Sequence, residues 1–346
     1  MGSRRNSSRL WIAGLVAAFG IIYTVGDSYY NVIMEQTVTE EEDNSIYDYK
    51  YDVIVDNPDS SFWQAVYDSA KTSARENNVL LEMKGTGRGT QYDKIDFMNI
   101  SIASKADGII LEYNGESGLE EKINQAEAEG IPVVTVMSDA PKSKRQSFVG
   151  VSEYQLGTAY GEQVAEFVNR DTRDILILLK RNIDDMNQSQ IYTQISNAAL
   201  EKASRGQNIN ITGKNLLSTG TFETEEAVTD IFQQKSGIPD ILVCMDEETT
   251  ECARQAVIDF NLAGQVTIIG YYISDDILTA VEKGVISVTC DVDTSQLGEY
   301  SVEALTEYLK EGRANSYYNV DISFLGQGDV YQAEKEVQGD EEIPVE

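Results

Sequence analysis

From Tyr49 onward, short apolar runs alternate with longer segments that have the period of amphipathic helices. The apolar runs predict strands at 51–55, 78–84, 107–113, 131–136 and 147–151, and then at 174–179, 209–217, 240–245, 266–272 and 285–290. The segments between and after them predict helices at 62–77, 92–105, 119–130, 155–169, 189–204, 223–234, 248–261, 275–283 and 294–311. Strands that are apolar throughout and are separated by helices indicate parallel sheets covered on both faces.

This pattern occurs twice, so we expect an α/β fold of two doubly wound parallel-sheet lobes. Two further short strands are expected near 319–325 and 329–333. The chain has only five prolines and no Pro- or Gly-rich linker between the lobes. Two independent domains would normally show such a linker. We therefore expect several short crossings, which form a hinge and allow the lobes to close around a ligand.

The N-terminus has a segment without charge, Leu10 to Val25, preceded by three arginines. Basic residues ahead of an apolar segment keep that end in the cytoplasm. The segment is short for a membrane span and long for a secretory core, and no Ala-x-Ala cleavage site follows it. We expect a single-pass anchor over 10–26, with a cleaved signal peptide as the alternative. Residues 1–9 would be a cytoplasmic basic tail, 27–48 an acidic stalk and 334–346 a loose acidic tail.

The composition narrows the function classes. Acidic residues outnumber basic ones 58 to 27, which gives a net charge of −31 and makes nucleic-acid binding untenable. The excess indicates a solvated acidic surface or, alternatively, a cationic ligand. Histidine is absent, which excludes His-dependent nucleophile systems and His-containing zinc sites. Cys244 and Cys290 end apolar runs and are interpreted as buried small hydrophobes, with a disulfide as the alternative.

The stretch "VIVDNPDSSFW" carries the first candidate binding residues. A buried strand ends at Asp56, turn residues follow, and Phe62 and Trp63 stand where a helix begins. Ligands of open α/β sheets bind beyond the carboxyl ends of the strands. We therefore expect Ser60, Ser61, Phe62 and Trp63 at the edge of a cleft. The alternative is that one of the rings packs into the core between helix and sheet.

Taken in order, five segments resemble the type I periplasmic binding proteins of the ribose- and galactose-binding kind, over about Tyr49 to Gln332. They are "VIVDNPDSSFWQAVYDSAKTSA", "ADGIILEYNGESGLEEKINQAEAEGIPVVTVMSDAP", "FVGVSEYQLGTAYGEQVAEFV", "PDILVCMDEETTECARQAV" and "TIIGYYISDDILTAVEKGVISVTCDVDTSQLGEYSVEAL". The resemblance implies a Venus-flytrap with ligand between two lobes and three crossings. It also implies that the rings of Phe62 and Trp63 are exposed to a ligand's apolar face. The lobes would be 49–151 plus 292–325 and 152–291 plus 326–333.

The resemblance also implies site residues, with departures from the family pattern. Met137-Ser138-Asp139 stands where sugar binders keep Asp followed by Arg or Ser, and Met245-Asp246 stands for an Asn-Asp pair. The arginines with which the family's sugar binders hold a pyranose are missing from these positions. Few other residue types can make the bidentate hydrogen bonds of an arginine. The positions carried over are Ser138, Asp139, Tyr192, Phe222, Asp246, Tyr272 and Asp291. Such a cleft could hold a small polar or sugar-like ligand, a cationic one, or none if its aromatics fill it.

The function expected first is solute capture for an ABC transporter permease, with the folded body outside the cell membrane. The alternative is a membrane-tethered sensor read by a histidine kinase. An enzyme is not expected, because the acid pairs 184–185, 247–248 and 275–276 stand where helix starts favour acids. "KGTGRGT", 84–90, lacks the spacing of a phosphate loop, so no nucleotide cofactor is expected. A repressor-like regulator would need a basic helix-turn-helix where the apolar segment stands.

Overall fold

The computed structural model describes residues 47–86, 92–180, 189–216, 221–233 and 237–329. The predicted anchor, most of the predicted stalk and the acidic tail lie outside these residues. Among the helices that are described, none is both long and apolar enough to cross a bilayer. The chain from Tyr47 onward clusters as one unit by its internal contacts, and both lobes belong to it.

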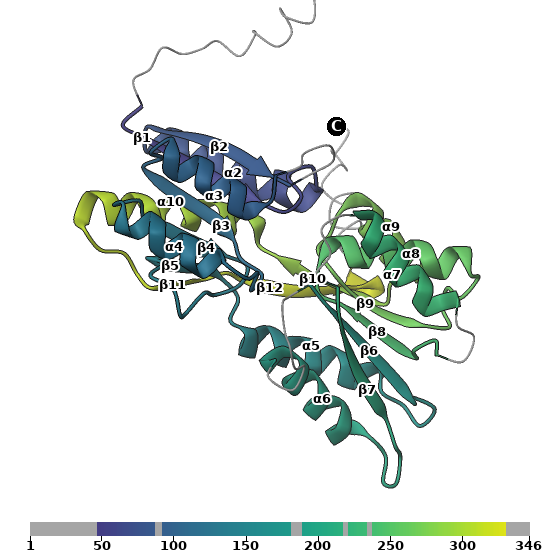
Figure 1. Cartoon of the computed structure of the whole chain (residues 1–346). Coiled ribbons are helices and arrows are strands. Elements are labelled where there is room, and N and C mark those ends of the chain that lie inside the picture. The colour runs from purple at the N-terminus through teal and green to yellow at the C-terminus, as the bar shows by residue number, and fades with distance from the viewer. Residues whose placement is uncertain (1–46, 87–91, 181–188, 217–220, 234–236, 330–346) are drawn as a thin grey trace, which may run out of the picture. The chain divides into compact units, whose positions relative to one another are not determined.

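The first lobe is built on a six-stranded parallel sheet with the strand order β11-β5-β4-β3-β1-β2. Its strands are β1 (Tyr49–Val55), β2 (Val79–Gly85), β3 (Gly108–Glu112), β4 (Val133–Val136), β5 (Ser147–Gly150) and β11 (Tyr317–Asn319). Helices α2 (Ser61–Glu76) and α10 (Thr294–Glu311) pack side by side on one face, and α3 (Lys94–Ala103) and α4 (Leu119–Ala128) on the other (Figure 1). Both faces are therefore buried, as the unbroken apolar strands predict.

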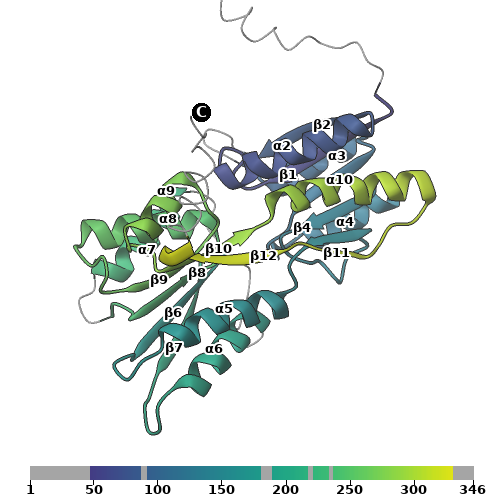
Figure 2. The ribbon, with the colours of Figure 1, turned by 180° about the vertical axis from the view of Figure 1, so that it is seen from behind.

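The second lobe repeats this plan with the order β12-β10-β9-β8-β6-β7. Its strands are β6 (Asp174–Leu179), β7 (Asn210–Asn215), β8 (Ile241–Cys244), β9 (Thr267–Tyr271), β10 (Val288–Val292) and β12 (Ile322–Gly326), of which only β12 is antiparallel. Helices α5 (Glu153–Phe167) and α6 (Gln190–Lys202) cover one face, and α7 (Thr221–Gln233), α8 (Glu247–Asp259) and α9 (Asp275–Glu282) the other (Figure 2). The predicted class, two doubly wound α/β lobes, is confirmed.

Local sequence explains where these helices begin and how closely they pack. Ser60 caps α2 by accepting the Trp63 backbone N–H, and Asp246 caps α8 by accepting that of Thr249. Acids fill the first turns of α8 and α9, where they complement the helix dipole, as predicted for 247–248 and 275–276. Gly298 of α10 lies so close to α2 that a Cβ there would be 2.3 Å from the Val66 carbonyl oxygen.

The chain crosses between the lobes three times, after β5, after β10 and between β11 and β12. The third crossing corrects the predicted lobe boundary. β12, at 322–326, pairs with β10 and so belongs to the second lobe rather than the first. The strand expected at 329–333 is also wrong where it is described, because Asp329 lies in a helical turn. The connection between β11 and β12, at 320–321, is only two residues long, so its sequence contains no pattern that predicts the chain's passage from the first sheet to the second.

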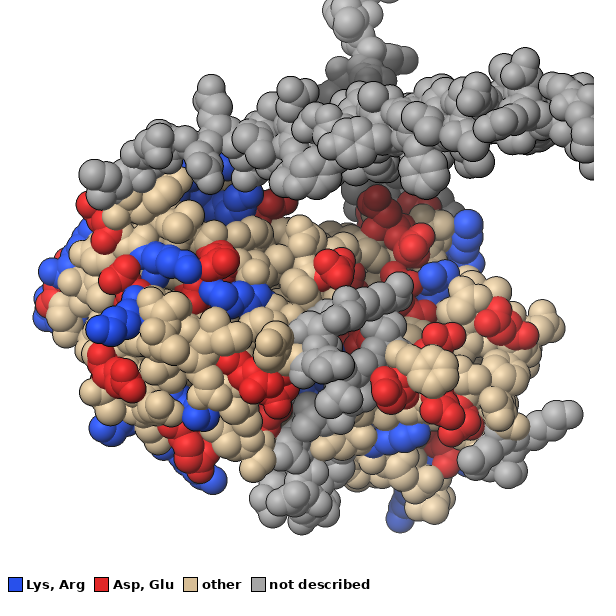
Figure 3. Space-filling view, turned by 45° about the horizontal axis from the view of Figure 1, so that its top comes forward, with Lys and Arg blue, Asp and Glu red and all other residues tan. Residues whose placement is uncertain are grey.

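The three cysteines are free, and Cys244 and Cys290 are fully buried in the second lobe. Their interpretation as small core hydrophobes is confirmed. On the surface shown in Figure 3, acidic and basic side chains are interspersed rather than segregated. This face fits the solvated-surface interpretation of the acidic excess.

Candidate ligand-binding site

A cavity of about 70 Å³ lies between the two lobes, at the carboxyl ends of strands from both sheets. This is the position that the doubly wound strand order predicts for a ligand. The first lobe contributes residues that follow β3, β4 and β5, and the second lobe those that end or follow β6, β8, β9 and β10. The lining residues are Glu112, Asn114, Met137, Ser138, Gly150, Val151, Leu156, Leu179, Lys180, Ile191, Met245, Asp246, Tyr271, Val292 and Leu297.

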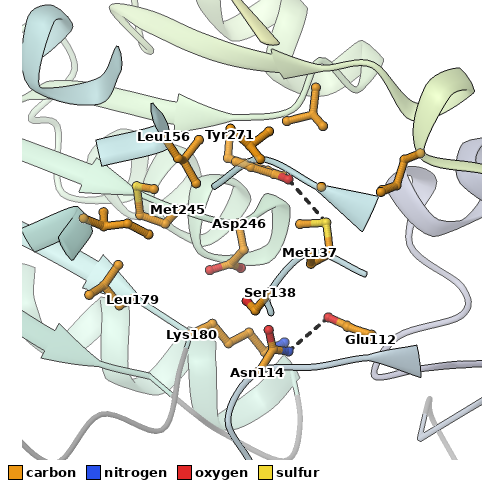
Figure 4. A pocket seen from close by; sticks show the side chains of 15 residues that line it. Glu112, Asn114, Met137, Ser138, Leu156, Leu179, Lys180, Met245, Asp246 and Tyr271 are labelled. Carbon is orange, nitrogen blue, oxygen red and sulfur yellow. Dashed lines mark hydrogen bonds between the residues drawn. The ribbon is translucent and has the colours of Figure 1, made fainter. Parts of the chain in front are cut away.

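Glu112, the last residue of β3, provides one carboxylate of the polar side. It is 8% exposed, and it accepts hydrogen bonds from the Asp56 backbone N–H at 2.6 Å and from the Asn114 amide at 3.1 Å (Figure 4). Burial raises its pKa to about 7, and the nearby Asp56 carboxylate acts in the same direction, against the opposing effects of Lys94 and Lys180. A carboxyl group that titrates near neutral pH in a cavity marks a candidate functional site.

Lys94 stands behind this carboxylate at the start of α3 and is almost completely buried. Its ammonium forms ion pairs with Asp56, at 3.0 Å, and with Glu116. Burial alone would lower the pKa of Lys94, but the carboxylates of Glu112, Asp56 and Glu116 raise it. This lysine therefore remains charged and is engaged by Asp56 and Glu116.

The second lobe presents Lys180 and Asp246. The Lys180 ammonium forms an ion pair with Glu248 at 2.9 Å, and the surrounding carboxylates raise its pKa although burial opposes them. Asp246 accepts hydrogen bonds from the backbone N–H and the hydroxyl of Thr249, at 2.9 and 2.8 Å. Burial nevertheless raises the pKa of Asp246, because these bonds and Lys180 offset the lost hydration only in part.

Ser138 follows β4 and lies at the centre of the polar side (Figure 4). Its side chain is 5% exposed and lines the cavity, and its Oγ has no hydrogen-bond partner among the residues that the structure describes. A buried hydroxyl without a partner costs about 1–3 kcal/mol, so native structures rarely keep one without a reason. The Ser138 hydroxyl is therefore available to a molecule in the cavity.

The remaining lining is mostly apolar. Two of the residues in this region, Met137 after β4 and Tyr272 after β9, have left-handed backbones with φ of 69° and 70°. Their places in the two lobes are equivalent, because β4 and β9 are each the fourth strand of their lobe in chain order. Non-glycine residues with such backbones cluster at functional sites, where the surrounding structure holds them. The Tyr271 hydroxyl lies 3.7 Å from the Met137 sulfur and joins the lobes across the cavity.

A second set of contacts closes the lobes beside the cavity. The Glu247 carboxylate at the start of α8 accepts hydrogen bonds from the Ser61 hydroxyl and, at 3.2 Å, from the Phe62 backbone N–H at the start of α2. The Phe62 ring packs against Tyr271 and Tyr272, with ring centroids 5.8 and 5.2 Å apart. The Tyr272 hydroxyl donates to the Ser61 carbonyl at 3.4 Å. The structure is therefore closed by contacts of the protein with itself.

Phe62 and Trp63 differ from their expected exposure, being 4% and 5% exposed. Trp63 belongs to the core, which was the alternative interpretation, and Phe62 covers the second lobe's tyrosines instead of the cavity. The Ser60 cap fixes the direction of α2, so that its first turn meets the opposite lobe. Neither ring lines the cavity, so they offer no stacking surface there.

Of the other predicted residues, the structure places only Ser138 and Asp246 in the cavity. Asp139 binds Arg145 through two hydrogen bonds of 2.6 and 2.8 Å. The Tyr192 hydroxyl donates to the carbonyl of Ile211 in β7. Phe222 is 72% exposed, and Asp291 lies within β10 beside the return crossing.

The sequence interpretation missed Glu112, Asn114 and Lys180. Glu112 and Asn114 come at and just after the carboxyl end of β3, and Lys180 directly follows β6. The sequence signal that could have identified these residues is a polar residue at the end of an apolar run. The sequence interpretation used that signal for other strands but not for β3 and β6. Among the described residues, no group of three or more Asp, Glu or Cys could hold a metal ion.

Comparison with known proteins agrees with this architecture. No curated protein sequence matches the chain. Among solved structures, GanP, a glucose–galactose binding protein from Geobacillus stearothermophilus, is 21% identical, with a TM-score of 0.70, over 81% of this chain and 98% of its own. The XylFII–LytSN complex matches with a TM-score of 0.70 and 22% identity, over 82% of this chain and 100% of the other.

A third structure is a periplasmic solute-binding protein of an ABC transporter from Actinobacillus succinogenes with bound D-allose. It is 18% identical, with a TM-score of 0.66, and the match covers 82% of this chain and 99% of that one. At these identities the likenesses establish the fold. The sequence pattern of the periplasmic binding protein domain matches residues 51–314, which include both sheets except β11 and β12. The chain therefore belongs to the family of the periplasmic binding protein domain.

Proposed function

We propose that this protein is an extracytoplasmic solute-binding protein that captures a small polar ligand between its lobes and presents it to an ABC transporter permease. The observation that carries the proposal is the cavity with polar groups from both lobes. Ser138 and Glu112 come from the first lobe, and Lys180 and Asp246 from the second. A ligand that bridges them would favour the closed arrangement over an open one, which is what a closing receptor requires.

Sugars are the first ligand class to test. The similar structures include a glucose–galactose binding protein and one with bound D-allose. The family and these neighbours are binding proteins, which supports binding rather than catalysis. We extend to this chain the idea of a sugar-like ligand, although none of the described residues that line its cavity is an arginine that could hold a pyranose.

A thermal-shift screen of the full chain against sugars, polyols, amino acids and amines tests the proposal. A ligand at one hundred times its Kd adds about 2.7 kcal/mol to the stability of the folded state. For a protein of this size that corresponds to a rise in Tm of several degrees. If no small molecule of any class stabilises the protein, the solute-binding proposal fails.

The second candidate is a membrane-tethered sensor whose closed form is read by a histidine kinase. One structurally similar protein, XylFII, is found in complex with another protein, LytSN, which supports a role in which a partner protein reads the lobes. The predicted anchor at 10–26 would hold such a sensor at the membrane. Genes beside this one that encode a permease and an ATPase would favour delivery, whereas kinase and response-regulator genes would favour sensing.

A further inference from the structure

The cavity is divided into a polar and an apolar side. In Figure 4, Glu112, Asn114, Ser138, Lys180 and Asp246 gather on one side, while Met245, Leu156 and Tyr271 lie on the other. The apolar wall is completed by Val151, Leu179, Ile191, Val292 and Leu297. A neutral sugar carries hydroxyl groups around its whole ring, so it would leave several of them unpaired against this wall.

Among the residues that the structure describes, the polar side has more negative than positive charge. Two lysines face five carboxylates there, which are Asp56, Glu112, Glu116, Asp246 and Glu248. Both lysines are already engaged, Lys94 by Asp56 and Glu116 and Lys180 by Glu248. Within the described residues, neither Glu112 nor Asp246 forms a direct ion pair, although Lys180 acts on both carboxylates and Lys94 acts on Glu112 as nearby charges. A cationic ligand in direct contact would further compensate the hydration that these carboxylates lose.

Ser138 supplies an independent indication that a ligand belongs here. Its Oγ is buried, faces the cavity and has no hydrogen-bond partner in the described part of the chain. A hydroxyl oxygen can accept a hydrogen bond from an N–H group, as the two carboxylates can. The polar side thus offers acceptors from both lobes to a single group with several N–H donors.

The size of the cavity limits the ligand. An engineered apolar cavity of about 150 Å³ is filled by benzene, whereas this cavity measures about 70 Å³. A hexose has about twice as many heavy atoms as benzene, so it would require the lobes to part. A short aliphatic chain with one small polar head requires far less room.

We propose that the cavity binds a small organic ammonium ion with a short aliphatic body, held through Asp246, Glu112 and Ser138. The inference rests on the proposed solute-binding function and narrows its ligand class. The ammonium group donates to the two carboxylates and the Ser138 hydroxyl, and the aliphatic body packs against Met245, Leu156 and their apolar neighbours. Lys180 keeps its ion pair with Glu248 and acts on Asp246 as a nearby charge.

The test titrates the full chain with n-butylamine, which is charged at neutral pH, and with its neutral isostere 1-butanol. D-Glucose, D-galactose and D-allose form the sugar arm. Isothermal titration calorimetry should show binding of n-butylamine at least tenfold tighter than that of 1-butanol. Equal affinity for the amine and the alcohol would overturn the role of charge.

The matched variants are Asp246→Asn and Asp293→Asn. Both residues cap a helix, Asp246 that of α8 and Asp293 that of α10, and asparagine caps about as well as aspartate. Only Asp246 lines the cavity. Asp246→Asn should weaken n-butylamine about tenfold to a hundredfold, the loss expected for a charge-assisted hydrogen bond. Asp293→Asn should leave that affinity unchanged, and an equal loss in both variants would overturn the assignment.

The amine and sugar titrations distinguish a failure of the ammonium proposal from a failure of the solute-binding function on which it rests. If a sugar binds and n-butylamine does not, the ammonium proposal is overturned and the solute-binding function stands. If neither amines nor any other small molecule bind, both are overturned. Binding of n-butylamine that depends on Asp246 supports both.

Discussion

Replacing Glu247 with alanine should loosen the closed arrangement of the lobes. The Glu247 carboxylate of the second lobe accepts hydrogen bonds from the Ser61 hydroxyl and the Phe62 backbone N–H of the first. The Phe62 N–H belongs to the first turn of α2, where backbone donors have no partner within the helix. The positive end of the helix dipole attracts the same carboxylate. The substitution removes all of these interactions at once.

The free energy that Glu247 contributes to closure can be estimated from its hydrogen bonds and from the hydration that its carboxylate loses. A hydrogen bond to a charged group contributes about 1.5–3 kcal/mol. Burial raises the pKa of Glu247 despite its bonds to Ser61, Phe62 and Ser60, so the lost hydration offsets part of the gain. We therefore expect the lower end, about 1.5 kcal/mol, which is roughly a tenfold fall in the ratio of closed to open molecules.

Single-molecule FRET can measure that ratio with one dye at Glu129, beside α4, and one at Gln255, on α8. The control is Glu251→Ala, one turn further along α8. Glu251 bonds to Arg254 and Ser274, both within its own lobe, so this change should leave the ratio unaltered. If Glu247→Ala leaves the distribution of transfer efficiencies unchanged, or if both variants shift it alike, the contact does not hold the lobes together.

Three further changes test other parts of the structure. Trp63→Ala should lower the free energy of unfolding by about 3–5 kcal/mol in urea titrations, because the ring lies in the core; a change below 1 kcal/mol would contradict its burial. Gly298→Ala should destabilise by about 1–3 kcal/mol, since its Cβ would collide with Val66. Gly312→Ala after α10 controls for the loss of a glycine, because its Cβ would meet no atom within 4 Å, although its φ of 73° adds strain. For Glu112 the folded pKa is about 7 against an ordinary value of 4.5, so the folded state binds more protons between these values and unfolding free energy should fall as pH rises through them. Glu112→Gln should flatten that slope, and an unaltered slope would assign it to other groups.

Periodicity in the sequence located the helices and strands closely. For example, β6 was expected at 174–179 and is found there, and α10 begins and ends at the predicted residues 294 and 311. Apolar runs and helix caps are local features, so they appear in the sequence without knowledge of the fold. The change of sheet between β11 and β12 was misplaced, because it depends on pairing with β10, thirty or so residues earlier, rather than on local pattern.

The candidate site could be predicted only in outline. The family resemblance indicated Ser138 and Asp246 as binding residues, and the structure places both in the lining of the cavity. The resemblance could not show that Glu112 and Lys180 would face them from two different lobes. It also could not show that Phe62 would turn to Tyr272, far away in the chain, instead of toward the cavity.

The sequence by itself determined the layers of this protein, since the central strands and the helices that cover them are specified by the apolar residues they bury. The tertiary structure decided which side chains share one space. The cavity is made by the ends of seven strands from two sheets, and its charge balance depends on which lysine reaches which carboxylate. Such distances are set by the packing of the lobes against each other, and no local pattern encodes them.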